Sequence, residues 1–356
     1  MISKFLNLKT KQLQLLKPLL LSIIFSSALF LPPSLKLIKF ALLILALIFA
    51  SNSLGIATEE LSAYFSSTLS GLINATFGNL AEIIIGFFVI LQGHTELAKA
   101  SITGSILSNL VLLVGLAFLV ASYKKESIRL QNKVADTSST LLLTSVLFLL
   151  FPSLLFLFHE QEFIKPISIS IAIILLSIYF FYIIFSFFTH KKWFVDKNKK
   201  HVPVLSKGAS LILMLISIVI LTILSEYIAN VIEPIGQILH LNQLFLGAII
   251  IGFVGNAAEH LSVITLAKKQ KHEFILPIAI GSSIQVAMFV GPLLVLLSIF
   301  TRNFMSLVFS PLEIFSIFVA VLLANQIASD KEITWFESVQ LIGLYLIIAI
   351  TFYFVK

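Results

Sequence analysis

The chain has 356 residues, of which 58% are hydrophobic and only 12% are charged, with a formal net charge of +7. Soluble domains are about 45–50% apolar, so this composition excludes an ordinary soluble protein and predicts an all-α integral membrane protein. The short alternating segments of a membrane β-barrel are not found in the sequence. The chain contains no cysteine. Disulfides and thiolate metal ligands therefore play no part in the interpretation.

Apolar runs long enough to cross about 30 Å of hydrocarbon as helices predict eleven transmembrane spans. The first run is followed at once by a second one and lacks a small-residue cleavage site, so we expect it to be retained as a helix. In chain order the predicted spans lie near residues 14–31, 36–57, 71–91, 99–122, 138–158, 166–188, 208–232, 242–267, 274–299, 311–328 and 335–355.

The basic residues predict the orientation of these spans. An odd number of crossings puts the two ends of the chain on opposite sides of the membrane, and 18 of the 24 Lys and Arg residues then fall on the side of the N-terminus. Cytoplasmic loops are enriched in Lys and Arg, so we expect a cytoplasmic N-terminus and a C-terminus outside. Because this topology accounts for the positive charge, we expect the lipid bilayer and no nucleic acid as a partner.

A short motif occurs twice. GNLAE at 78–82 recurs as GNAAE at 255–259, an offset of 177 residues, and with this offset GSILSN at 104–109 falls opposite GSSIQV at 281–286. Five predicted spans separate the copies, so the two motif helices run in opposite directions. Inverted repeats of this kind are typical of secondary transporters, whose binding site lies between the two halves near the middle of the bilayer.

The duplication predicts the organisation of the whole chain. We expect an N-terminal cytoplasmic segment with an extra helix, a first repeat of five helices, a basic cytoplasmic linker and a second repeat of five helices. Their respective ranges are 1–34, 35–188, 189–206 and 207–356.

Each copy of the motif places Gly, Asn and Glu on one helical face, because residues three and four apart are neighbours. Two antiparallel copies supply carboxylate, amide and carbonyl oxygens, which suit Ca²⁺ better than Mg²⁺. When the ion leaves, two close buried carboxylates favour protonation, which predicts an exchange of one Ca²⁺ for two protons. The alternative is a pair of structural acids bonded to neighbouring helices. The candidate metal-binding residues are Gly78, Asn79, Glu82, Gly255, Asn256 and Glu259, with Glu82 and Glu259 also coupling protons.

Further polar residues are candidates for a pathway or a gate, namely Ser105, Ser108, Asn109, Ser282, Ser283, Gln285, His260, Glu59 and Glu226. Small and hydroxyl residues also line ordinary helix contacts in membranes. His260 is open to interpretation as a packing residue or a proton relay. Glu59 and Glu226 could equally be solvated residues at helix ends. Glu313 in SPLE at 310–313 has the spacing of a capping box, so we expect it to be structural.

Several of these stretches resemble the calcium/proton exchanger (CAX) family of the calcium:cation antiporters. The matching stretches are GLINATFGNLAEIIIG at 71–86, GSILSNLVLLVG at 104–115, GNAAEHLSVITLAKK at 255–269 and GSSIQVAMFVGPLLVL at 281–296, with weaker matches in SEYIANVIE at 225–233 and WFESVQLIGLYLIIAI at 335–350. The resemblance implies one extra N-terminal helix plus two inverted five-helix repeats, Ca²⁺ as the transported substrate and no cofactor. It also implies that Glu82 and Glu259 share the cation and the protons.

The resemblance has further consequences and one departure. Asn256 stands where sodium-coupled relatives are more acidic, so protons are favoured over Na⁺, and the short N-terminus favours a bacterial plasma (inner) membrane. Many family members carry an acidic linker, whereas the linker here is basic. Antiport of Ca²⁺ or another divalent cation against Na⁺ and a passive cation channel stay open as alternatives, as does a homo-oligomer. An enzyme is not expected, because the sequence shows neither a nucleophile paired with a base nor a zinc motif.

Overall fold

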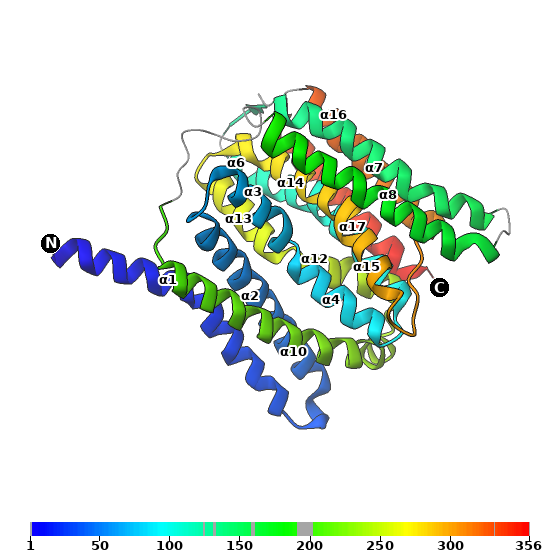
Figure 1. Ribbon diagram of the computed structural model, residues 1–356, viewed down its shortest axis with the longest axis horizontal. Helices are drawn as coiled ribbons and strands as arrows, with labels where there is room; N and C mark the ends of the chain where they lie inside the picture. The colour runs from blue at the N-terminus through cyan, green and yellow to red at the C-terminus, as the bar shows by residue number, and fades with distance from the viewer. Residues whose placement is uncertain are drawn as a thin grey trace.

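The computed structural model describes residues 2–123, 125–130, 133–157, 161–190, 202–330 and 332–355. Within these ranges the chain is almost entirely helical, and Figure 1 shows long helices side by side with the two chain ends at opposite edges. Of the predicted linker at 189–206, residues 191–201 lie outside the described ranges.

Before the linker, the structure contains fourteen elements, in which η marks a short 3-10 helix or, for η3 and η5, a π-helical segment. They are α1 (Ile2–Ser26), η1 (Ser27–Phe30), η2 (Pro33–Leu35), α2 (Lys36–Ser62), α3 (Ser67–Phe77), α4 (Leu80–Leu91), α5 (Thr95–Leu107), η3 (Ser108–Leu113), α6 (Val114–Ala121), β1 (Ser127–Arg129), α7 (Lys133–Leu157), η4 (Gln161–Phe163), α8 (Ile164–Ile184) and η5 (Phe185–Thr189).

Beyond the linker the pattern is similar, and η6 and η8 are π-helical. The elements are α10 (Lys207–Leu239), α11 (Gln243–Phe245), η6 (Leu246–Ile251), α12 (Gly252–Gly255), α13 (Ala257–Lys268), η7 (His272–Phe274), α14 (Ile275–Gln285), η8 (Val286–Val290), α15 (Gly291–Ser298), α16 (Pro311–Asp330), β2 (Glu332–Thr334) and α17 (Trp335–Phe354).

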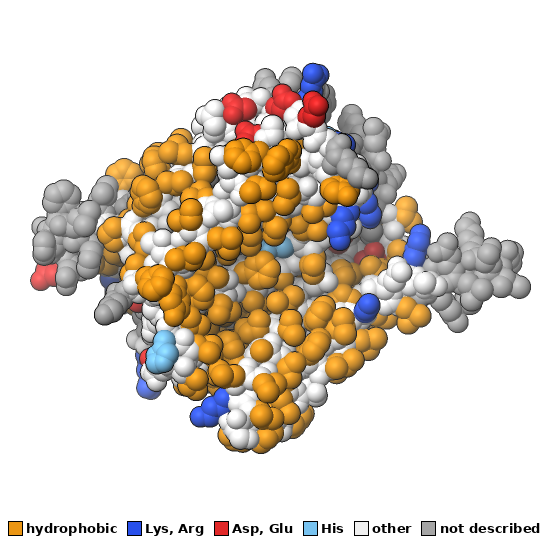
Figure 2. Space-filling model, turned by 180° about the vertical axis from the view of Figure 1, so that it is seen from behind, with side chains coloured by type: hydrophobic (Ala, Val, Ile, Leu, Met, Phe, Trp, Pro, Cys, Tyr) orange, Lys and Arg blue, Asp and Glu red, His pale blue; other side chains and the backbone are white. Residues whose placement is uncertain are grey.

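The chain is an integral membrane protein by the length and apolar character of its helices. In the described ranges nine helices are long and apolar enough to cross a membrane, and the bent pair Gln243–Gly255 and Ala257–Lys268 would make a tenth. The described part of α7 adds a shorter apolar stretch, Thr140–Ser153. The predicted total of eleven spans therefore stays a prediction. Figure 2 shows hydrophobic side chains over most of one face, with the charged side chains gathered toward its edges.

Helix ends are set by local polar contacts. Ser206 caps α10, its side chain accepting a hydrogen bond from the Ala209 N–H, and the residue after the helix, His240, is in the left-handed conformation. At the start of α17, Thr334 and Glu337 form a capping box. Such contacts satisfy backbone groups that have no partner within the helix.

The two repeats are visible in the helices themselves. With the offset of 177, the end of α2 at Ser62 corresponds to the end of α10 at Leu239, and these two helices pack along each other. The π-helical segments η3 and η8 also begin at nearly equivalent places, Ser108 and Val286. Single π-helical turns are often found at functional sites. Both segments follow the helix that carries the second pair of matched motifs.

The layout defines two sides of the molecule. We call the side where α3 and α10 begin the near side, and the opposite side the far side. On the near side β1 pairs antiparallel with β2, with Ser127 opposite Thr334. On the far side the Asn303 side chain donates to the carbonyl oxygens of Ile90 and Leu91 at 3.1 and 3.2 Å. Each of these contacts joins two segments that the predicted topology places on the same side of the membrane.

Candidate cation-binding site

The first motif interrupts its helix. α3 ends at Phe77 and α4 begins at Leu80, so Gly78 and Asn79 stand between two helical segments. A Cβ on Gly78 would lie 2.5 Å from the carbonyl oxygen of Asn74, so this position requires glycine because of its own preceding turn. Among the described residues, no atom of a neighbouring helix is found within 4 Å of that Cβ position, so this glycine does not serve the close approach of another helix. Glu82 follows in the first turn of α4, where the helix dipole favours a negative charge.

The second motif interrupts its helix more sharply. α12 ends at Gly255 and α13 begins at Ala257, and the two helical pieces are bent by 60°. Here the glycine does admit a neighbour, because a Cβ on Gly255 would lie 2.9 Å from Cγ of Glu82. Glu259 lies in the first turn of α13, so the two helix N-termini place both acids at the break of their helices.

The two acids of the duplicated motif interact electrostatically. The Glu82 carboxylate lies within electrostatic range of Glu259. Glu82 is 9% exposed and Glu259 is partly buried. Two interacting carboxylates in a poorly hydrated site repel each other unless a cation or protons neutralise them.

Asn109 joins most of the second motif into one hydrogen-bond network. Its Nδ2 donates to Oδ1 of Asn256 and to Oγ of Ser282, both at 3.0 Å. The Ser282 hydroxyl in turn donates to Oε2 of Glu259. Because Asn109 Oδ1 can only accept, its 3.1 Å contact with Nε2 of His260 requires the proton to be on that nitrogen. His260 is thus linked to Glu259 through two intervening side chains.

The first motif has a simpler partner. Nδ2 of Asn79 donates to Oε1 of Gln285 at 2.5 Å, across the two repeats. Ser105, the equivalent of Ser282, donates to the Gly252 carbonyl oxygen at 3.4 Å and lines the same pocket as Glu82.

Two buried oxygens of the first motif have no hydrogen-bond partner. They are Oε2 of Glu82 and Oδ1 of Asn79, which lie on the same helical turn. Buried polar atoms are nearly always paired, so a pair of unsatisfied acceptors indicates a place for a cation or a proton. Both of these free atoms are oxygens, the ligand type that suits a hard cation such as Ca²⁺. Within the described ranges, no cluster of three or more His, Cys, Asp or Glu side chains could hold a metal.

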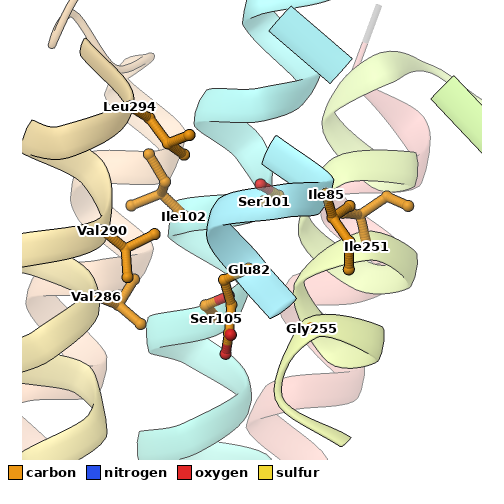
Figure 3. A pocket seen from close by; sticks show the side chains of 10 residues that line it. All are labelled: Glu82, Ile85, Ser101, Ile102, Ser105, Ile251, Gly255, Val286, Val290 and Leu294. Carbon is orange, nitrogen blue, oxygen red and sulfur yellow. The ribbon is translucent and has the colours of Figure 1, made fainter. Parts of the chain in front are cut away.

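Apolar side chains lie between Glu82 and the far side. Figure 3 shows the Glu82 carboxylate beside Ser105 and pointing away from Ile102 and Leu294, which line the same pocket. α15 runs from the near side toward the far side, and Leu294 lies farther toward the far side than the Glu82 carboxylate (Figure 3). An ion that leaves Glu82 toward the far side has to pass these side chains. The pocket is lined by Glu82, Ile85, Ser101, Ile102, Ser105, Ile251, Gly255, Val286, Val290 and Leu294.

The remaining predicted residues fall into two groups. Ser108 and Ser283 are buried, and their hydroxyls donate to carbonyl oxygens of their own helices, those of Ser105 and Ala279, and not to the acids. The exposed residues Glu59 and Glu226 lie on α2 and α10, outside the network around the motifs.

Glu313 makes the predicted capping box. Its backbone N–H donates to Oγ of Ser310 at 3.3 Å, and the Ser310 N–H donates to its carboxylate at 2.9 Å. The other carboxylate oxygen accepts from Thr103 at 3.0 Å, so Glu313 also ties α16 to α5. The predicted capping box is confirmed.

Sequence reasoning did not identify Ser51. This buried residue of α2 donates to the carbonyl oxygen of Gly255 at 3.2 Å and so contacts the second motif directly. Its equivalent at the offset of 177 is Ile228, so the repeat pattern carried no signal for it.

The two halves cover the site unequally. On the far side α5 packs along η6 and α12, whereas α3, their equivalent, packs against α2 and η5. The exposure of matched residues agrees. Ala100, Ser101, Gly104 and Ser108 of α5 and the start of η3 are buried, and their equivalents Pro277, Ile278, Gly281 and Gln285 are partly exposed. The site is therefore closed toward the far side and more open toward the near side.

Comparison with known proteins gives the family. The family model described as sodium/calcium exchanger protein matches residues 35–188 and 209–354. The Ca(2+)/H(+) antiporter ChaA of Bacillus subtilis (strain 168) is 33% identical over 323 residues, covering 89% of this chain and 92% of that protein.

Solved structures agree. The structure of native YfkE matches with a TM-score of 0.79 and 32% identity over 94% of this chain and 97% of that chain. The crystal structure of the H+/Ca2+ exchanger CAX shares the fold, with a TM-score of 0.76 and 17% identity over 97% and 92% of the two chains. The chain belongs to the sodium/calcium exchanger family and, within it, to the calcium/proton exchangers.

Proposed function

We propose that the chain exchanges Ca²⁺ for protons by alternating access, with Glu82 and Glu259 holding one Ca²⁺ or two protons in turn. The observation that carries the proposal is the buried Oε2 of Glu82, which has no hydrogen-bond partner and lies within electrostatic range of the second acid. Relatives named Ca(2+)/H(+) antiporter support the choice of ions.

The chemistry of the site supplies the coupling. Bound Ca²⁺ neutralises both carboxylates, and Oδ1 of Asn79 is a further buried oxygen without a partner. In the absence of the ion, protonation of the acids restores an electrically neutral site. Only with the site in one of these two neutral forms can the protein change easily between its inward-open and outward-open conformations, since uncompensated buried charges are costly. Ca²⁺ and protons therefore move in opposite directions.

The orientation is part of the proposal. If the basic loops lie in the cytoplasm, the near side faces the cytoplasm and the described conformation is open for Ca²⁺ uptake from the cytosol. A bacterial plasma membrane, eleven spans and the division into 1–34, 35–188, 189–206 and 207–356 belong to the same proposal. The excess of Lys and Arg on the side of the N-terminus supports it.

The test is Ca²⁺/H⁺ exchange in everted membrane vesicles, measured with radioactive Ca²⁺ and a pH-sensitive dye. We expect Glu82→Gln and Glu259→Gln each to abolish exchange while the protein still folds. Glu59→Gln, on the exposed face of α2, is the matched control and should retain exchange. Flux like that of the wild type in either site variant would contradict the shared site.

The coupling ion is tested separately. Uptake by the purified protein in proteoliposomes should follow an imposed pH gradient and be indifferent to a Na⁺ gradient. Dependence on Na⁺ would support Na⁺/Ca²⁺ antiport instead. Uptake that continues with neither gradient, down the Ca²⁺ gradient alone, would support a passive channel.

A further inference from the structure

Two glycines of the near side do not meet as their equivalents do on the far side. The offset of 177 relates Gly104 to Gly281 and Ala248 to Gly71. A Cβ on Gly104 would lie 1.9 Å from the carbonyl oxygen of Ala248, so these helices touch backbone to backbone. A Cβ on Gly281 would meet nothing within 4 Å, and one on Gly71 would lie 2.1 Å from the ring of Phe187.

The segment that carries Phe187 lies along α3. Phe187 belongs to η5, the π-helical extension of α8, and its carbonyl oxygen accepts from Oγ1 of Thr68 at 3.4 Å. Two turns earlier in the chain, in α8, the Tyr179 hydroxyl donates to the carbonyl oxygen of Ala75 at 3.3 Å. The equivalent of Ala75 is Gly252, which on the far side lies against the backbone of α5. Side chains of α8 and η5 thus occupy part of the face of α3 that the repeat symmetry gives to α14.

We propose that Phe187 is a positioning residue that keeps the near side open, because its ring fills the place on Gly71 that Gly281 takes when the near side closes. The proposal rests on the alternating access proposed above. Helices that pack backbone to backbone through small residues leave no room for an aromatic ring between them. The ring must therefore leave Gly71 before α3 and α14 meet, and its contact stabilises only the open arrangement.

Two substitutions should act in opposite directions. Phe187→Ala removes the ring, so the arrangement closed on the near side and open on the far side becomes more populated. Gly281→Leu adds a side chain where the present conformation has free space, so the protein should fold, but α3 can no longer approach α14. If Phe187 had a merely structural role, Phe187→Ala would not shift the two arrangements in the direction opposite to Gly281→Leu.

The readout is the reactivity of a single cysteine, which is straightforward because the chain has none. Ser101→Cys on α5 is suitable, since Ser101 is 8% exposed and lines the pocket on the closed far side. Labelling of the protein in sealed vesicles of one orientation, by a membrane-impermeant maleimide added only on the far side, then reports opening of the far side. We expect the rate to rise about fivefold with Phe187→Ala and to fall with Gly281→Leu.

The matched control is Phe188→Ala, because Phe188 is the next residue and its side chain is 64% exposed. It should leave the labelling rate unchanged. An unchanged rate with Phe187→Ala, an equal rise with Phe188→Ala or a parent protein that never labels would each overturn the proposal. If Phe187→Ala does not fold, Phe187→Leu should still raise the rate by about twofold, and no rise would overturn it.

Failure of the proposed function gives a different result. The labelling is measured without Ca²⁺ at a single pH, so it reports the two arrangements whichever ions are carried. Absence of Ca²⁺/H⁺ exchange in vesicles together with the expected labelling pattern would reject the ions and leave the role of Phe187 standing.

Discussion

The backbone of Gly255 lies directly against the side chain of Glu82, so the glycine of one motif contacts the acid of the other. A Cβ at Gly255 would come within 2.9 Å of Cγ of Glu82. The two motifs are therefore parts of one site in space, although 177 residues separate them in sequence.

This contact predicts that Gly255→Ala displaces the Glu82 carboxylate from its place beside the second motif. We expect exchange to fall by at least about tenfold, which corresponds to roughly 1.4 kcal/mol, with little loss of stability. Vesicle flux and the thermal midpoint of the purified protein are the measurements. Gly343→Ala on α17 is the control, because a Cβ there meets nothing within 4 Å. Equal flux in the two variants would argue against the contact.

The pair of acids predicts a pH dependence of Ca²⁺ binding. Protons and Ca²⁺ compete for the same oxygens, so the apparent affinity for Ca²⁺ should increase as the pH rises and decrease as the pH falls. Titration calorimetry in buffers of different ionisation enthalpy should show protons released on binding, fewer of them with Glu82→Gln. Binding that releases no protons at any pH would contradict the shared site.

Asn109 should matter for both stability and exchange. Asn109→Ala removes the donor to Oδ1 of Asn256 and Oγ of Ser282 and the acceptor for Nε2 of His260, so we expect a loss of about 1–3 kcal/mol in the free energy of unfolding. Exchange should fall as well, because Ser282 orients Glu259. Chemical denaturation and vesicle flux check both effects. Ser108→Ala is the neighbouring control, since its hydroxyl bonds only within its own helix.

Glu313 should behave as a structural acid despite being 4% exposed. Glu313→Gln weakens the cap of α16 and the hydrogen bond from Thr103, so we expect a loss of about 1–2 kcal/mol of stability. Exchange by the folded protein should stay within about twofold of the parent, because ordinary structural substitutions act through stability. Loss of exchange in fully folded Glu313→Gln protein would place this acid on the ion pathway instead.

Much of the site could be predicted because the repeat is written in the sequence. The fixed offset identified Glu82 and Glu259 as partners, and the structure brings their motifs into contact. The capping box at Glu313 depends on residues three apart, and it is confirmed. The count of eleven spans stays a prediction.

What the sequence determined by itself was the membrane class, the duplication and the pairing of the two acidic motifs, since composition and spacing are properties of the chain alone. Tertiary structure decided that Ser51 bonds the Gly255 carbonyl, that Asn109 joins three side chains, and that Phe187 rests on Gly71. These contacts depend on which helix faces which, and two equivalent halves were made unequal by the conformation the protein adopts. An offset between repeats records what the halves share, and packing alone fixes how they differ.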